Sequence, residues 1–241
     1  MPPVDPPRPF HVHLTGFGPF GSHKVNPSWE AVRRLDRTSL DEPPPDLSTH
    51  NLDPTTPSDR RDRPIRLTAS LLPVEYDVVL SQVPALHSDT PPPDLVVHVG
   101  VGLDGQVALE RRARKWGYAK IDVDGHLAPV DETTGRRGFT GREYSTFQEE
   151  LETQINIDEV VSNARRKGLR YVAVSDDAGL YLCEFTFYAS LASALVSNSG
   201  RPTPVQFIHV PSIGKPYSLD ELTAALKIVV WSIVNESGLG Q

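Results

Sequence analysis

The apolar residues of the chain fall into short runs, several of them continuous, that alternate with longer stretches of helical spacing. The runs occur at 12–15, 65–74, 95–101, 171–174 and 205–210. Continuous apolar runs are typical of strands that are buried on both faces of a largely parallel sheet. The runs therefore predict a central sheet of at least these strands.

The segments between the runs predict the helices that cover this sheet. They lie at 26–32 and near 75–87, 158–167, 180–197 and 218–235. The first carries an N-cap residue and a proline in its first turn, and the last opens with a capping box at 218–221. The alternation predicts an α/β protein: a single three-layer α/β/α sandwich with a mixed, mostly parallel central sheet.

Proline marks a segment that does not fit this alternation. Residues 37–64 hold six of the 23 prolines and ten charged residues, with only scattered leucines. Such a composition cannot bury enough apolar surface to offset the entropy of ordering it. We expect a mobile surface insertion at about 37–64 within one domain that spans residues 1–241.

Charge and hydropathy limit the classes of partner that the protein is expected to bind. The formal net charge is -7 at pH 7, and the basic runs at 60–63 and 111–115 are short. A net anion without a basic patch is not expected to bind nucleic acid or an anionic membrane. No apolar stretch has the length of a membrane span, and residues 1–7 lack the layout of a signal peptide, so we expect a cytoplasmic protein.

Cys183 is the only cysteine in the 241 residues. It cannot form a disulfide within the chain or a multi-cysteine metal site, so it is either a small buried apolar residue or a nucleophile. It follows a predicted strand and a turn at 175–179, which places it near the first turn of a helix. Unpaired backbone N–H groups and the helix dipole favour a thiolate there.

A cysteine nucleophile needs a base, and His209 is the best placed of the eight histidines. It closes the predicted strand 205–210, one helix after Cys183. We expect that strand to neighbour the strand before Cys183 in a βαβ unit, so that the two side chains meet at one rim. His98 is expected in the core, and the other six histidines on the surface.

Glu110 is a candidate for the acid that orients the imidazole. It lies in a segment, 106–114, that alternates apolar and polar residues. A carboxylate there could accept the distal imidazole N–H. A surface ion pair with the arginines that follow is the commoner arrangement, and the residues alone leave both open.

The first predicted turn matches a dinucleotide-binding fingerprint. Glycines stand at 16, 18 and 21 in a G-x-G-x-x-G pattern after a strand. However, Pro19 interrupts the run, and the helix signals begin only at Asn26. A nucleotide-dependent oxidoreductase is therefore the weaker alternative.

Several of these segments together resemble one known family. They are the blocks at 15–21, 26–32, 94–101, 178–183 and 207–211, which resemble the pyroglutamyl-peptidase I family of cysteine peptidases. The resemblance implies a hydrolase that removes an N-terminal pyroglutamyl residue through a thioester. It assigns the nucleophile to Cys183, the base to His209 and the acid to Glu110. It implies no metal and no cofactor.

The resemblance also implies a pocket for the lactam ring and the identity of the partners. The implied substrate-binding residues are Phe17, Phe20, Asn26, Val101 and Leu182. N-terminally pyroglutamylated peptides are the implied partners, and a homo-oligomer is left open. The segment 111–118 is more basic than the family pattern, which tends to carry an asparagine near Lys115. This departure keeps a second alternative open, a binding or regulatory protein that has lost turnover.

Overall fold

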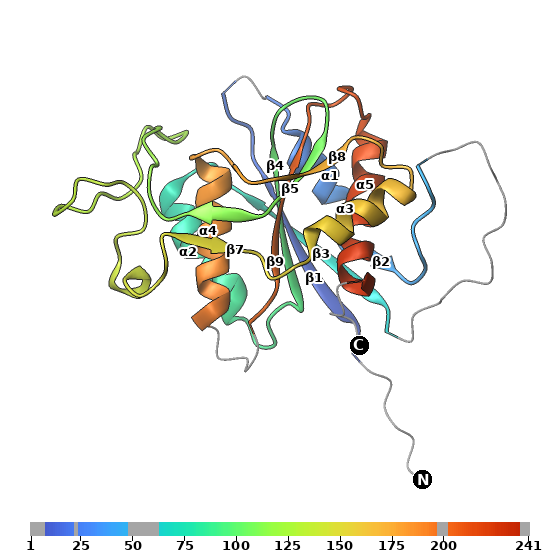
Figure 1. Ribbon diagram of the computed structural model, residues 1–241, viewed down its shortest axis with the longest axis horizontal. Helices are drawn as coiled ribbons and strands as arrows, with labels where there is room; N and C mark the ends of the chain where they lie inside the picture. Colours follow the sequence, from blue (N-terminus) through green and yellow to red (C-terminus); the bar gives the residue numbers. More distant parts are fainter. Residues whose placement is uncertain (1–7, 22–23, 48–62, 197–201, 237–241) are drawn as a thin grey trace, which may run out of the picture.

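The computed structural model describes residues 8–21, 24–47, 63–196 and 202–236. Its centre is a seven-stranded sheet in the order β2-β3-β1-β4-β9-β5-β8 (Figure 1). The strands are β1 (Phe10–Phe17), β2 (Ser39–Leu40), β3 (Ile65–Leu72), β4 (Leu95–Val101), β5 (Val107–Glu110), β8 (Val172–Ser175) and β9 (Val205–Val210). A separate two-stranded sheet pairs β6 (Arg112–Arg114) with β7 (Glu150–Glu152).

The strand directions confirm the predicted mixed, mostly parallel sheet. Strands β3, β1, β4 and β9 form a continuous parallel block. Strand β2 is antiparallel to β3, and β5 is antiparallel to β9 but parallel to β8. Strands β4 and β9 have the bounds that their apolar runs predicted, because both are buried on both faces.

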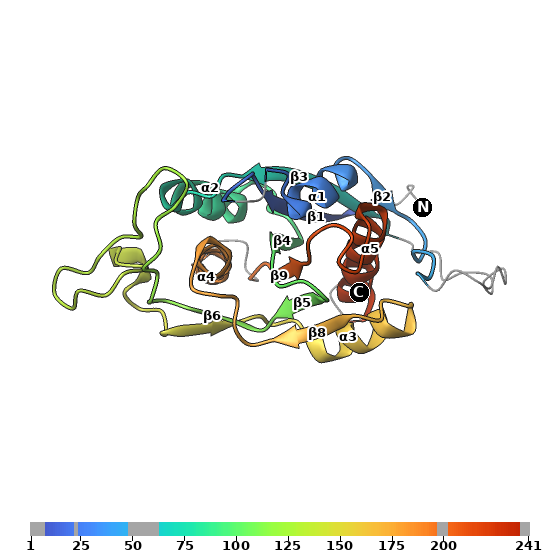
Figure 2. The ribbon, with the colours of Figure 1, turned by 90° about the horizontal axis from the view of Figure 1, so that it is seen from above.

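Helices cover both faces of this sheet, as predicted for a three-layer sandwich. One face carries α1 (Pro27–Val32), α3 (Ile157–Arg166) and α5 (Leu219–Glu236), and the other carries α2 (Tyr76–Ser88) and α4 (Leu182–Val196) (Figure 2). Two short 3-10 helices, η1 (Arg33–Leu35) and η2 (Arg142–Tyr144), lie in connections.

The sheet divides the apolar core into two parts. Strand β9 shows the division, because Ile208 belongs to the core beneath α3 and α5 whereas Phe207 belongs to the core beneath α2 and α4. Successive strand residues point to opposite faces. His209, two residues after Phe207, therefore faces the α4 side.

The predicted βαβ arrangement around the cysteine is wrong. Strand β5 lies between β8, which precedes Cys183, and β9, which carries His209. The cause is a four-residue strand that returns antiparallel along β9 after β4 ends. Its alternating sequence did not predict that it inserts there. Glu110 is thereby carried on the strand directly beside that of His209.

The predicted insertion at 37–64 is described only at 37–47 and 63–64. Within it, Leu40 is buried in β2, and the backbone N–H of Leu47 donates to the carbonyl of Lys167 at 2.9 Å. This part of the chain packs against the rest of the protein, because its scattered leucines find apolar partners. Residues 48–62 lie outside the described residues.

A long excursion between β6 and β7 was not predicted. It projects beside α2 and α4 (Figure 1). Asp122 anchors it, because its buried carboxylate accepts the backbone N–H of Tyr76 at the start of α2 at 3.2 Å. Lys115 anchors it again through Nζ, which donates to the carbonyl of Tyr144 at 2.6 Å. The first contact fixes the excursion beside the N-terminus of α2, and the second joins the two ends of the excursion to each other.

Three histidines on the α2 and α4 side of the sheet are held in a neutral state. His98 is fully buried against Thr15, as expected of a core residue. His87 is buried and bonded to Ser190 at 2.8 Å, so its predicted surface position is wrong. Burial lowers the pKa of His13 and of His87 to about 4, and lowers the pKa of His98 well below its ordinary value.

These histidines predict a loss of stability in mild acid. The unfolded chain takes up protons below about pH 6.5, whereas the folded chain does so only near pH 4 or below. The free energy of unfolding should therefore fall as the pH drops from 6.5 towards 4, by up to about 1.4 kcal/mol per pH unit for each histidine. Urea unfolding at a series of pH values measures this.

The variant His87→Gln should reduce the slope of the free energy of unfolding against pH by the contribution of one buried histidine. His126→Gln is the matched control, because His126 is exposed. An unchanged slope in His87→Gln would contradict the assignment of His87 to the neutral buried set.

Candidate active site

Cys183 lies in the first turn of α4, as predicted, and faces the end of β4. A methyl group on Gly100 would lie 2.9 Å from Cys183 Sγ and 2.9 Å from Cζ of Phe207. Glycine at position 100 therefore makes room for the sulfur. In the sheet, Gly100 is the register partner of His209, which brings the cysteine and the histidine to one rim.

His209 is held by Glu110 from the neighbouring antiparallel strand. His209 Nδ1 and Glu110 Oε1 are 2.7 Å apart. Glu110 pairs directly with Phe207, so its side chain is a diagonal neighbour of His209 on the same face of the sheet. Because a carboxylate only accepts hydrogen bonds, Nδ1 is the donor. The other ring nitrogen is thereby left for the sulfur or a substrate.

The charges in this group favour a protonated imidazole. Burial by itself lowers the pKa of His209, but the charge of Cys183, its hydrogen bond to the ring, and the bond and charge of Glu110 together raise that pKa to about 10. Glu110 is only 1% exposed, so little solvent screens its charge. The arrangement supports a protonated imidazole at position 209 at neutral pH.

Packing fixes the imidazole in place. The ring of Phe207 lies 4.9 Å from that of His209, centroid to centroid. A methyl group on Gly102 would lie 2.7 Å from Cβ of His209, so the backbone after β4 closes against the histidine. Sequence reasoning missed both glycines and Phe207. The available signal was the pair of glycines at 100 and 102, at the end of the apolar run 95–101 and directly after it.

The residues predicted to bind substrate differ in how deeply they are buried. Phe17 is buried and its ring lies 6.4 Å from that of Phe207. Phe20 is half-buried and lies 6.4 Å from the ring of Tyr181. Val101 is half-buried directly after Gly100, whereas Leu182 is buried in the core beneath α2 and α4. Phe20 and Val101 are thus the more accessible of these four.

Asn26 uses its side chain to hold the glycine turn and α1. Its amide nitrogen donates to the carbonyl of Gly18 at 2.9 Å. Its oxygen accepts from the backbone N–H and from the hydroxyl of Ser28. The structure therefore places Asn26 behind the turn that carries Phe17 and Phe20.

The glycine fingerprint has a packing role. A methyl group on Gly16 would lie 2.7 Å from Cα of Trp29, so Gly16 allows β1 and α1 to approach closely. The helix begins only at Pro27, well after the glycines. A pyrophosphate cradle needs the helix to start within the glycine run, so the geometry gives no support to the oxidoreductase alternative.

Tyr181 was not predicted and borders the site. Its hydroxyl donates to the carbonyl of Ile121 in the excursion at 3.0 Å. Its ring meets Phe20 and Tyr76, and the ammonium of Lys120 lies 5.8 Å from its centroid. Tyr181 therefore joins the glycine turn, α2 and the excursion. The tyrosine two residues before Cys183 gave no local signal of this role.

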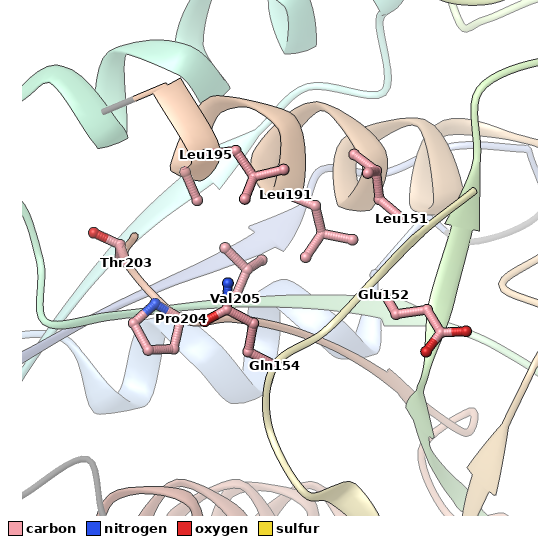
Figure 3. Close-up of a pocket in the computed structure, with 9 residues that line it drawn as sticks. Leu151, Glu152, Gln154, Leu191, Leu195, Thr203, Pro204 and Val205 are labelled. Atoms are coloured by element: carbon pink, nitrogen blue, oxygen red, sulfur yellow. The ribbon is translucent and has the colours of Figure 1, made fainter. Parts of the chain in front are cut away.

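A hollow in the surface lies at the other end of α4 (Figure 3). Its lining includes Leu191 and Leu195 of α4, Leu151 of β7 and Val205 at the start of β9. Leu195 is twelve residues beyond Cys183, or about 18 Å along the helix. The hollow is thus separate from Cys183.

The described residues contain no group of three or more His, Cys, Asp or Glu side chains arranged to hold a metal ion.

The close approach at Gly100 predicts the effect of adding one methyl group. Gly100→Ala should displace Cys183 or Phe207 and lower kcat/KM by about 100-fold. The measurement is the rate of peptide or arylamide hydrolysis together with the melting temperature. Gly18→Ala is the folding control, because its methyl group would lie 3.7 Å from the nearest atom and should leave the melting temperature unchanged. Wild-type activity in Gly100→Ala would refute the close approach.

Comparison with known proteins gives one consistent answer. The profile of the family described as pyroglutamyl peptidase matches residues 10–45 and 65–233. Pyroglutamyl-peptidase 1 of Homo sapiens is 35% identical over 224 residues, covering 91% of this chain and 87% of the relative. Pyrrolidone-carboxylate peptidase of Chromobacterium violaceum is 29% identical, covering 91% and 90%.

A solved structure agrees with the sequence relatives. The crystal structure of Bacillus amyloliquefaciens pyroglutamyl peptidase I superposes with a TM-score of 0.69 at 26% identity, covering 96% of this chain and 97% of that one. The family profile matches most of the chain, including the segments that carry Glu110, Cys183 and His209. The chain belongs to the pyroglutamyl peptidase family.

Proposed function

We propose that this protein is a cysteine exopeptidase that hydrolyses the N-terminal pyroglutamyl residue from peptides. The observation that carries the proposal is that Cys183 lies against Gly100, whose partner in the sheet is His209, and that His209 is bonded to Glu110. A nucleophile, a base and an orienting acid in this order form the general arrangement for acyl transfer. Membership of the family supplies the substrate class.

In the proposed mechanism, the Cys183 thiolate attacks the carbonyl carbon that joins the pyroglutamyl ring to the next residue. The first turn of α4 has backbone N–H groups without intrahelical acceptors, and these stabilise the developing oxyanion. His209 imidazolium gives its proton to the leaving amine, so the C–N bond breaks and a thioester remains. His209 then removes a proton from water, which hydrolyses the thioester and regenerates the thiolate.

The pyroglutamyl ring is neutral, compact and partly apolar, so its pocket needs apolar walls. We assign the walls to Phe17, Phe20 and Val101. Leu182 supports them from the core, and Asn26 supports the turn that carries the two phenylalanines. The proposed chemistry uses protein side chains, backbone N–H groups and water.

Family membership does not by itself give the protein's partners or its location in the cell, so both are part of the proposal. The proposed partners are N-terminally pyroglutamylated peptides rather than nucleic acid or membranes, and a homo-oligomer remains a prediction. None of the helices in the described ranges is long and apolar enough to cross a bilayer. The cytoplasmic location is likewise kept as a prediction.

Hydrolysis of a pyroglutamyl-arylamide under reducing conditions tests the function. The wild-type protein should release the arylamine, and Cys183→Ala should release none, because no other cysteine can replace the nucleophile. A prolyl-arylamide, which lacks the lactam carbonyl, is the substrate control and should react poorly.

Failure of the folded wild-type protein to release arylamine would reject the peptidase. Binding of a pyroglutamyl peptide without turnover would instead favour the alternative of a binding protein that has lost activity.

The raised pKa of His209 predicts the alkaline side of the pH profile. The imidazolium persists through neutral pH, so kcat/KM should fall only as the pH approaches about 10. Glu110→Gln removes the hydrogen-bonded negative charge that helps to raise this pKa. The alkaline fall should then move to lower pH by roughly one unit or more.

Asp158→Asn is the control for this shift, since Asp158 is exposed and belongs to α3. The profiles are measured from pH 6 to above 10. An alkaline fall at the same pH in Glu110→Gln and wild type would show that Glu110 does not control the proton of His209.

A further inference from the structure

The residue after the cysteine, Glu184, is buried and charged. It is 1% exposed and is the only charged residue of α4. Adjacent positions of a helix are about 100° apart. Cys183 faces Gly100 and His209, so Glu184 points elsewhere, towards β6.

Four hydrogen bonds hold the Glu184 carboxylate. Oε1 accepts from the backbone N–H of Arg114 at 2.8 Å and from its Nε at 2.6 Å. Oε2 accepts from Nη2 of Arg114 at 2.8 Å and from the backbone N–H of Leu180 at 2.9 Å. The guanidinium also bonds Asp177. Such pairing offsets the cost of burying the charge, and here it joins α4 both to β6 and to the turn before the helix.

Farther along α4, Tyr188 donates to the carbonyl of Gln148 and Ser190 bonds His87, but both lie more than one turn beyond Cys183. Most of its residues are buried and apolar or small, and they lie on every side of the helix. Apolar burial is non-directional, so it fixes where the helix lies more firmly than how it is rotated about its axis. A rotation of about 20° would move an atom that lies about 5 Å from the axis by nearly 2 Å.

We propose that the Arg114–Glu184 ion pair is a positioning pair that fixes the rotation of the first turn of α4, and thereby the placement of Cys183 Sγ against His209. Strand β6, which carries Arg114, follows β5 after one residue, and β5 carries Glu110. One short segment therefore holds both the imidazole and the helix of the nucleophile. The effect on turnover rests on the proposed function.

Glu184→Gln tests the pair, because it removes the charge and one acceptor while keeping the side-chain shape. We expect kcat to fall by about 10- to 100-fold, since small displacements of reacting groups cost rates of this order. KM should stay close to the wild-type value, because the residues assigned to the ring walls lie on other elements. Alkylation of Cys183 by iodoacetamide at neutral pH should also slow, because the displaced thiolate loses the imidazolium.

Two further variants complete the experiment. Arg114→Lys keeps the charge but cannot bridge both carboxylate oxygens. We therefore expect kcat and the alkylation rate to fall here too, but by less than in Glu184→Gln. Glu150→Gln is the matched control, because it breaks the exposed Arg112–Glu150 pair in the same two-stranded sheet and should leave both rates unchanged. All rates are measured well below each variant's melting temperature.

Wild-type kcat and wild-type alkylation in folded Glu184→Gln would overturn the positioning role. A KM effect without a kcat effect would overturn it as well. If Glu184→Gln does not fold, Arg114→Lys decides by the same criteria. If the wild-type protein hydrolyses no pyroglutamyl substrate, the proposed function fails, and the alkylation rates alone still decide whether the pair positions Cys183.

Discussion

The site depends on the burial of one negative charge, that of Glu110. An imidazolium in a half-buried position is costly unless a counter-charge lies beside it. Glu110 supplies that charge at 2.7 Å from a strand that is almost wholly buried. The antiparallel pairing of β5 with β9 makes this contact possible. The insertion of β5 between β8 and β9 therefore places Glu110 beside His209, which the proposed proton chemistry requires.

The main sheet and helices could be predicted because their signals are local. Apolar runs gave the bounds of β4 and β9, and caps marked the starts of α1 and α5. Family resemblance, rather than spacing, assigned the acid to Glu110, since the residues alone left a surface ion pair open. The prediction that the strands before and after α4 are neighbours failed for two reasons. Strand β5 has only four residues, which is too short for a clear strand signal. The βαβ rule also takes no account of a strand inserted between the two that it pairs.

Contacts between distant residues were the part that could not be predicted. Arg114 and Glu184 are 70 positions apart, and each is of a residue type that is usually found on the surface. His87 has the sequence context of an exposed helix end, yet it is buried because Ser190 of α4 faces it. Asp122 caps a helix that begins 46 positions earlier. Such pairs form only when the layers assemble, so no window of sequence contains them.

The almost complete burial of α4 between the sheet and α2 has a consequence for how the protein loses activity. A nucleophile on a surface loop can be lost by local opening while the rest of the protein stays folded. Here Cys183 lies at the end of a helix whose packing is shared with one of the two cores. Displacing that helix would open the core, so inactivation by heat and loss of the folded state should be one event with one barrier.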